Sequence, residues 1–153
     1  MKVLVLGAGN MGLTYAEGMA NSPFLNKRKL MIFDVSPQKT EALSTMAQFD
    51  AYDSIEECVP QADVIFIAVK PYHSQSLFDS IKPYINQDQL FVSLMAGVTI
   101  NTIQEGLGVK KVIRTMPNLP AKVGKGVTSF TESKEVSRVE LLTVRSLLDT
   151  TGE

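Results

Sequence analysis

The sequence predicts an α/β fold, a doubly wound and mainly parallel sheet with helices on both faces. Short apolar runs recur along the 153 residues, and longer segments with helical spacing separate them. A hydrophobic content of 44% is enough for one domain with a single core. The sequence contains no Gly/Ser-rich linker and no internal repeat, so we expect one domain over residues 1–153.

Five apolar runs are the expected strands. Each run is continuous rather than alternating, which is typical of strands that a parallel sheet buries on both faces. The runs cover residues 3–6, 30–33, 64–69, 90–94 and 112–113.

The first two helices are predicted from their ends. Asn10 would cap the first helix, which would stop before Pro23 because proline cannot continue a helix. Ser36 followed by Pro37 is a start signal for the second helix. The buried stripe of this second helix is expected to consist of Leu43, Met46 and Ala47.

Four further helices are expected. Residues 54–57 match a capping box and would open a short helix that stops by Pro60. Two more helices would cover residues 74–82 and 99–105. The last would run from about Ser133 to Leu148, with helical spacing of Val136, Val139, Leu142 and Leu147. An irregular stretch after the fifth strand is a candidate site loop because it contains Pro117, Pro120, Gly124 and Gly126.

Composition excludes several classes of function. With a net charge of −1, the chain lacks the excess of basic residues that would indicate binding to nucleic acid or to an anionic membrane surface. The single cysteine, Cys58, allows no disulfide within the chain, and with the single histidine, His73, it excludes a zinc site built on Cys and His. No apolar run reaches the roughly 18 residues of a membrane span. We therefore expect a cytoplasmic protein without a metal ion.

Residues 7–12 read G-A-G-N-M-G, a G-x-G-x-x-G that follows the first expected strand and opens the first expected helix. Gly7 would permit a tight turn, Gly9 would let the backbone approach a pyrophosphate, and Gly12 would let helix and strand pack closely. The free N–H groups and the positive dipole end of that helix would bind the pyrophosphate. This context predicts a Rossmann-like dinucleotide site, although a plain turn is the alternative.

Asp34 bears on the choice of cofactor. It ends the second expected strand, about 20 residues after Gly12, where a carboxylate accepts from a ribose 2′-OH. The carboxylate would repel the 2′-phosphate of NADP, and residues 35–38 contain no arginine to hold that phosphate. Lys39 is the nearby cation that tempers this argument. The sequence therefore indicates NAD(P)H and favours NADH.

Four blocks of the sequence closely resemble the Δ1-pyrroline-5-carboxylate reductase family. They are G-A-G-N-M-G at 7–12, A-V-K-P at 68–71, S-L-M-A-G-V at 93–98, and R-T-M-P-N-L-P-A-K-V-G-K-G at 114–126. The blocks follow the order of the family and span nearly the whole chain. The first block is common to dinucleotide folds, whereas A-V-K-P and M-P-N-x-P-A-x-V-G-x-G are much more specific.

The resemblance implies reduction of 1-pyrroline-5-carboxylate to L-proline with NAD(P)H, the last step of proline biosynthesis. It implies that Ala68–Pro71 and Met95–Gly97 lie beside the nicotinamide ribose and that Asn118 shapes the nicotinamide side. The expected cofactor contacts are Leu6, Gly7, Ala8, Gly9, Asn10, Met11, Gly12, Asp34, Ala68, Val69, Lys70, Pro71, Met95, Ala96, Gly97 and Asn118. No catalytic side chain is expected, because hydride passes directly to the imine carbon and the protein mainly binds and orients.

The sequence also departs from the family. Members usually carry a smaller residue at the position of Met95 and often an Asn at that of Ser54, and many prefer NADPH. The family continues into a helical domain that forms a homodimer or higher homo-oligomer and binds the substrate. Residues 1–153 would then be the cofactor-binding part and would be inactive alone.

Several alternatives stay open. The chain could be another imine or hydroxyacid oxidoreductase, or a free-standing NAD(H)-binding regulatory domain, although such a sensor needs no nicotinamide-facing blocks. His73 is either a general acid or a surface histidine, and Lys70 contacts a cofactor through either its ammonium or its backbone. Glu56 and Glu57 would raise the pKa of Cys58, which argues against a reactive thiol.

Overall fold

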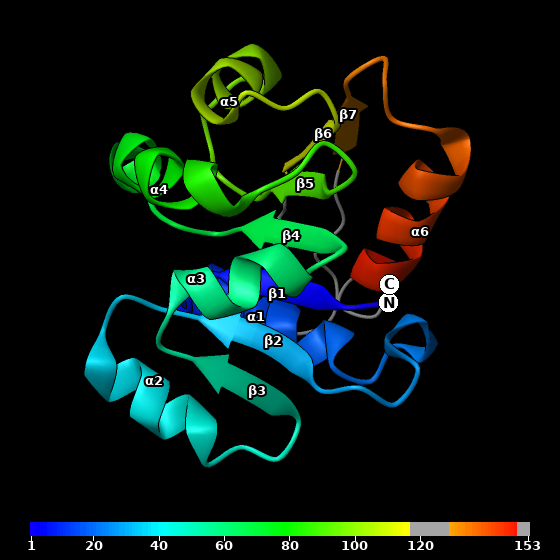
Figure 1. Ribbon diagram of the computed structural model, residues 1–153. Helices are drawn as coiled ribbons and strands as arrows, with labels where there is room; N and C mark the ends of the chain where they lie inside the picture. Colours follow the sequence, from blue (N-terminus) through cyan, green and yellow to red (C-terminus); the bar gives the residue numbers. More distant parts are fainter. Residues whose placement is uncertain (117–128, 150–153) are drawn as a thin grey trace.

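The computed structural model describes residues 1–116 and 129–149 (Figure 1). Its described part contains a seven-stranded sheet with the order β3-β2-β1-β4-β5-β6-β7. Neighbouring strands pair in parallel except β6 and β7, which are antiparallel. The strands are β1 Val3–Leu6, β2 Leu30–Phe33, β3 Phe49–Tyr52, β4 Val64–Ile67, β5 Leu90–Ser93, β6 Val112–Met116 and β7 Ser129–Glu132. The predicted doubly wound, mainly parallel sheet is confirmed.

Helices cover both faces of this sheet. The α-helices are α1 Asn10–Met19, α2 Pro37–Ser44, α3 Ile55–Cys58, α4 Ser74–Ile81, α5 Ile100–Leu107 and α6 Arg138–Asp149. Short 3₁₀ turns lie at Pro23–Leu25, Val59–Gln61, Pro71–His73 and Lys82–Tyr84. Buried residues of α1 and α6 belong to one core cluster, whereas those of α3, α4 and α5 belong to a second. The sheet therefore lies between two helical layers.

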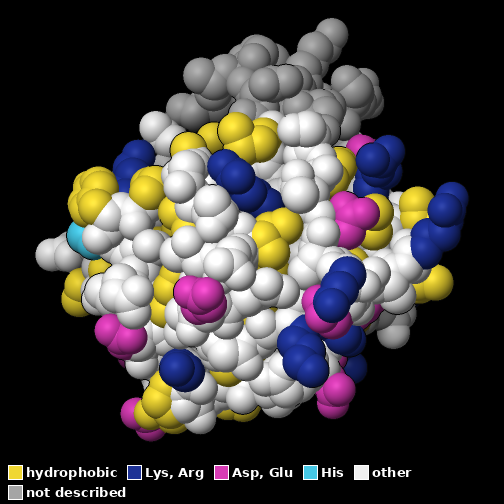
Figure 2. All heavy atoms as spheres, turned by 90° about the horizontal axis from the view of Figure 1, so that it is seen from above, with side chains coloured by type: hydrophobic (Ala, Val, Ile, Leu, Met, Phe, Trp, Pro, Cys, Tyr) yellow, Lys and Arg dark blue, Asp and Glu magenta, His cyan; other side chains and the backbone are white. Residues whose placement is uncertain are grey.

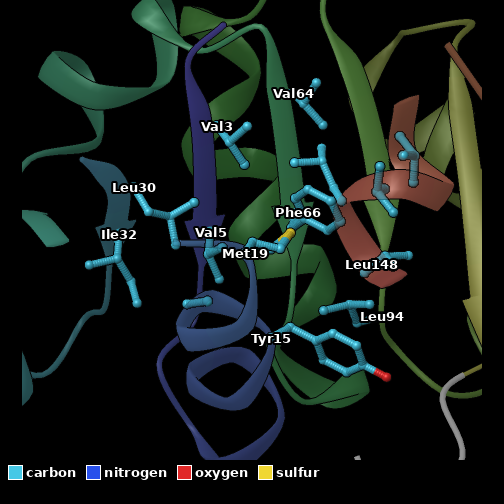
Figure 3. Packing of buried hydrophobic residues seen from close by; sticks show 14 of the residues in the cluster. Val3, Val5, Tyr15, Met19, Leu30, Ile32, Val64, Phe66, Leu94 and Leu148 are labelled. Atoms are coloured by element: carbon cyan, nitrogen blue, oxygen red, sulfur yellow. The ribbon is translucent and has the colours of Figure 1, made fainter. Parts of the chain in front are cut away.

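The two core clusters explain why the central strands read as continuous apolar runs. Successive side chains of a strand point to opposite faces, so Val5 joins the first cluster and its neighbour Leu6 joins the second. Figure 3 shows the first cluster, in which Tyr15 and Met19 of α1 approach the sheet beside Phe66 of β4. Both faces of β1, β2, β4 and β5 are buried in this way.

The prediction of strands missed β3 and β7, and ended β6 too early. Both missed strands lie at the edges of the described sheet, where each has a single partner strand. Only Phe49 of β3 is buried, and no residue of β7 is. The partly exposed Arg114 interrupts the apolar run of β6, which nevertheless continues to Met116. Strands with an exposed face carry no continuous apolar signal.

The start of α1 corrects one prediction. Gly9 is the N-cap of α1, with φ −73° and ψ −171°, and Asn10 is the first helical residue. By contrast, Ser36 caps α2 as predicted, because its Oγ accepts from the N–H of Lys39. The stripe expected for α2 is only partly correct. Leu43 is buried, but Ala47 is exposed because α2 ends at Ser44.

The capping box forms at a different serine from the one predicted. Ser54 precedes α3, but its side chain makes no cap hydrogen bond. At α6 the N–H of Glu140 donates to Ser137 Oγ at 3.1 Å, and the N–H of Ser137 donates to Glu140 Oε1 at 2.9 Å. The ammonium of Lys111 lies 2.9 Å from Glu140 Oε2. Partial burial would raise the pKa of Glu140, but the hydrogen bonds from Ser137 and Lys111 lower it below its usual value.

This cap also moves the start and the buried face of α6. The helix begins at Arg138 rather than Ser133, whose hydroxyl instead donates to the carbonyl of Lys110 at 2.6 Å. The predicted stripe was therefore wrong at Val139 and Leu142, whose side chains are 73% and 50% exposed. The residues that pack on the sheet and α1 are Leu141, Val144, Leu147 and Leu148.

Cys58 lies fully buried at the end of α3 in the second core cluster. Burial raises the pKa of its thiol to about 12, and the negative charge of Glu57 adds to this. Because the thiolate is the reactive form, we expect a chromogenic disulfide reagent at pH 8 to leave the native protein unlabelled. The same reagent should label one thiol per chain in denaturant. Rapid labelling of the native protein would contradict this environment.

Candidate functional site

The loops that follow β1, β2, β4 and β5 meet at one edge of the sheet, the edge formed by the carboxyl ends of these four parallel and adjacent strands (Figure 1). Backbone hydrogen bonds connect the loops sideways. Gly7 N–H donates to Phe33 O at 2.8 Å, and Ala68 N–H donates to Leu6 O at 2.9 Å. The chain leaves β1 toward β2 on one side and returns to β4 on the other. In open α/β sheets, ligands bind at such a switch point.

The three glycines of the turn meet different surroundings. Gly7 has φ +105°, and a Cβ there would lie 2.8 Å from the carbonyl oxygen of Ala68. A Cβ on Gly12 would overlap the carbonyl oxygen of Gly7. A Cβ on Gly9, however, would have no atom of the described residues within 4 Å. The fold therefore needs Gly7 and Gly12 to be glycine, whereas Gly9 borders open space that a ligand can enter.

The amino end of α1 offers backbone donors beside Gly9. Leu13 N–H is bonded to Gly9 O at 2.9 Å, and no side chain caps the turn. Among the described residues, the N–H groups of Asn10, Met11 and Gly12 have no acceptor. Unpaired N–H groups and the positive dipole end of a helix favour a bound anion. A dinucleotide pyrophosphate therefore fits the donors and the open space at this turn.

Asp34 lies at the end of β2 and contacts the glycine-rich turn directly. Its Oδ2 accepts from the N–H of Ala8 at 2.8 Å, and its Oδ1 accepts from the N–H of Ser36 at 2.9 Å. Asp34 is partly buried, and Val35 beside it is exposed. The carboxylate of Asp34 therefore has two backbone partners within the protein.

The A-V-K-P block forms the loop after β4. Ala68 and Val69 are partly buried, and Lys70 and Pro71 are exposed. Lys70 precedes the 3₁₀ turn Pro71–His73, in which His73 N–H donates to Lys70 O at 2.8 Å. This block thus lies at the same edge as the glycine-rich turn, to which Ala68 is bonded through Leu6.

In the loop after β5, fewer of the predicted cofactor contacts have exposed side chains than the sequence suggested. The side chain of Met95 is 2% exposed and belongs to the second core cluster, and its N–H is bonded to Ser93 Oγ at 3.1 Å. Ala96 and Gly97 are exposed, and Gly97 has φ +74°. Only Ala96, Gly97 and the backbone of this loop are free to line a ligand. Asn118 and the stretch around it lie outside the described residues.

Two large exposed hydrophobic side chains at this edge were not singled out from the sequence. Val35 follows β2 and Tyr72 follows A-V-K-P, and they are 84% and 79% exposed. The Tyr72 ring lies 4.4 Å from the ring of His73. An aromatic residue directly after the A-V-K-P block was the signal that could have revealed Tyr72. In Figure 2 the histidine, cyan, lies at the left rim beside hydrophobic side chains.

The described residues offer no metal centre and no oriented general acid. Within residues 1–116 and 129–149, no group of three or more His, Cys, Asp or Glu could hold a metal ion. Over the same ranges, no helix has the length and apolar character to cross a membrane. His73 is exposed and has no carboxylate partner in the described part of the chain, so nothing there orients it as a general acid.

Similarity to known proteins identifies the family. A family model described as "NADP oxidoreductase coenzyme F420-dependent" matches residues 2–97. The chain belongs to this family. Pyrroline-5-carboxylate reductase of Escherichia coli K12 is 35% identical over 153 residues, covering 99% of this chain and 57% of that protein. Pyrroline-5-carboxylate reductase 2 of Bacillus subtilis 168 is 35% identical over 155 residues, covering 99% and 55%. The resemblance inferred from the four sequence blocks is confirmed.

A solved structure agrees with this family assignment. The crystal structure of Plasmodium falciparum pyrroline carboxylate reductase with NADP bound matches with a TM-score of 0.84 at 29% identity. The match covers 99% of this chain and 55% of that one. The chain thus spans about half the length of the curated relatives it matches. The Rossmann-like fold is therefore shared with a family member over nearly the whole chain.

Proposed function

We propose that this chain is the cofactor-binding part of a pyrroline-5-carboxylate reductase, which reduces 1-pyrroline-5-carboxylate to L-proline with NAD(P)H. The observation that carries the proposal is the open space at Gly9 next to the N–H groups of Asn10 and Met11, which have no acceptor among residues 1–116 and 129–149. The relatives named above support the choice of reaction. Another imine or hydroxyacid reductase, or a regulatory NAD(H) sensor, has no comparable support.

The chain contributes binding and orientation to this reaction. The bound cofactor supplies the hydride for the imine carbon. The amino end of α1 would hold the pyrophosphate, and Asp34 would accept from the adenosine ribose. Ala68–Pro71, Ala96 and Gly97 would lie along the nicotinamide half, and Asn118 is proposed for the same half. The exposed apolar surface of Val35, next to Asp34, suits the flat adenine base.

We propose NADH as the preferred cofactor. The Asp34 carboxylate brings a negative charge to the place where NADPH carries its 2′-phosphate. The first side-chain cation after Asp34 in the sequence, Lys39, is exposed on α2 and has no ion-pair partner among the described residues. A single lysine on a solvated helix offsets this repulsion only weakly.

The proposal extends to partners and location. The relatives are longer than this chain, and we propose that the contacts to the substrate and those that form a homodimer lie in the part of the relatives it does not match. A cytoplasmic location is part of the proposal, since the one cysteine allows no disulfide within the chain. Lys/Arg and Asp/Glu side chains are interspersed over the face in Figure 2, which gives nucleic acid no basic patch there.

A titration with two cofactors tests the proposal. We expect the fluorescence of NADH itself to change and to saturate as the protein is added. NADPH should bind about tenfold more weakly, because the Asp34 carboxylate repels its 2′-phosphate. Oxidation of NADH that depends on pyrroline-5-carboxylate should stay at the background rate with this chain alone. Failure of both cofactors to bind would overturn the proposed function. Equal or tighter binding of NADPH would overturn the preference for NADH. Robust turnover by this chain alone would overturn the proposal that the substrate contacts lie in the part of the relatives that it does not match.

A further inference from the structure

We propose that Asp34 is a positioning residue that holds the glycine-rich turn in the shape that binds pyrophosphate. This inference rests on the proposed cofactor site but adds a second role for Asp34. The ribose contact is an interaction with the cofactor itself. The new role is an interaction within the protein, and it acts through the turn.

The contact that carries the proposal joins two loops that are far apart in sequence. Asp34 Oδ2 accepts from the N–H of Ala8 at 2.8 Å across a separation of 26 residues. Its other oxygen, Oδ1, accepts from the N–H of Ser36 at 2.9 Å, which fixes the carboxylate on its own turn. A carboxylate held at both oxygens is a rigid acceptor, and hydrogen bonds to charged groups are the stronger ones.

Ala8 has no other means of satisfying its N–H in the described part of the chain. The residue is 7% exposed, so solvent reaches it poorly, and no other acceptor for this N–H is found there. A buried N–H without an acceptor is costly, so the turn would rearrange if Asp34 were removed. Ala8 lies between Gly7, which has φ +105°, and Gly9, the N-cap of α1. A rearrangement at Ala8 would therefore change the direction in which α1 presents its first N–H groups.

The donors of the turn are thus divided between β2 and the ligand. Gly7 N–H donates to Phe33 O, and Ala8 N–H donates to Asp34, so both are anchored to the end of β2. The N–H groups of Asn10, Met11 and Gly12 are left unpaired among the described residues. Anchoring the first two donors keeps the later ones preorganised for an anion, which reduces the ordering cost of binding.

The two roles of Asp34 predict different results for a ligand that lacks the adenosine ribose. Reduced nicotinamide mononucleotide has a phosphate and a nicotinamide but no adenosine. If Asp34 acts only on the ribose, its removal leaves binding of this ligand unchanged. If Asp34 holds the turn, the Asp34→Ala and Asp34→Asn variants bind it more weakly. Asn keeps one acceptor oxygen but turns an NH₂ donor toward one of the two N–H groups, so it cannot satisfy both.

The experiment combines hydrogen exchange with binding. In the wild-type protein without cofactor, we expect the Ala8 amide to exchange slowly, and in Asp34→Ala at least about tenfold faster, with Val92 in β5 unchanged. Reduced nicotinamide mononucleotide should bind about tenfold more weakly to Asp34→Ala. Asp79→Asn is the matched control, because Asp79 is an exposed carboxylate on α4 that contacts only Gln75 among the described residues.

The outcomes separate this proposal from the proposed function. Equal exchange of Ala8 in wild type and Asp34→Ala overturns the positioning role, whatever the cofactors do. Faster exchange with unchanged binding of the mononucleotide overturns the link between the turn and the ligand. Failure of the wild type to bind NADH or NADPH overturns the proposed function instead. If Asp34→Ala does not fold, as judged by circular dichroism, the same two measurements on Asp34→Asn decide the question, because Asn keeps the size of the side chain but cannot accept from both N–H groups.

Discussion

Replacing Gly12 with alanine is expected to destabilise the protein severely. The added Cβ would overlap the carbonyl oxygen of Gly7, which is backbone and cannot rotate away. Either α1 must move off the sheet or the turn must open, and both disrupt the packing of Tyr15 and Ala16 in the first core cluster. We expect a loss of about 3 kcal/mol or more in the free energy of unfolding. That loss corresponds to a melting temperature lower by about 10 °C.

Thermal melts followed by circular dichroism measure this effect. Gly9→Ala is the matched control, since it places the same methyl group in the same turn where no atom lies within 4 Å. The control should melt within about 3 °C of the wild type, because replacing glycine by alanine at an N-cap costs only about 1 kcal/mol. If Gly12→Ala also melts within about 3 °C of the wild type, the close packing of α1 on the turn is refuted.

Gly9→Ala is expected to produce the opposite result, a folded protein with impaired cofactor binding. Its methyl group would occupy the open space beside the N–H groups at the start of α1 that find no acceptor in the described part of the chain. A pyrophosphate could then no longer approach the backbone closely. We expect the dissociation constants for NADH and NADPH to rise together by at least about tenfold. Both rise because the pyrophosphate is common to the two cofactors.

The same fluorescence titration that tests the wild type measures this change. Gly97→Ala serves as a second variant at the same edge. Gly97 has φ +74° and open surroundings, so alanine there strains the loop after β5 without touching the pyrophosphate turn. Wild-type affinity of Gly9→Ala for both cofactors would show that the pyrophosphate lies elsewhere, and the assignment of the turn would have to be abandoned.

The sequence was sufficient to predict the strands that are buried on both faces of the sheet. The runs at β1, β2, β4 and β5 are apolar on both faces, and a local pattern reports that burial directly. The edge strand β7 was missed because its neighbours, not its composition, place it in the sheet. Pairing with β6 is a long-range property, and a short polar segment does not reveal it.

Helix starts illustrate the same boundary between local and long-range information. S-x-x-E precedes a helix at Ser54 and at Ser137, and it also occurs at Ser129 in β7, so the local pattern alone does not identify a capping box. Only Ser137 forms the box, where Lys111 from the start of β6 holds Glu140 in place. A cap that depends on a partner from another element cannot be read from four residues.

The candidate site was predictable where backbone conformation is encoded by glycine. The roles of Gly7 and Gly12 follow from their spacing after a strand, and the structure gives each a steric reason. The contact between Asp34 and Ala8 was not predictable, because it depends on how closely two loops approach. Nor was the burial of Met95, whose side chain turns into the core at the point where β5 ends.

The burial of Cys58 has a practical consequence for measuring how the fold opens. It is the only thiol in the sequence, and from the end of α3 it joins Leu4, Leu6 and Met31 in the second cluster. A reagent reaches it only when that cluster separates, so the labelling rate under native conditions reports the population of opened molecules. A ligand that binds only the closed form lowers that population by mass action. The labelling rate of this natural cysteine therefore reports ligand-linked stability, and no probe residue has to be introduced into the chain.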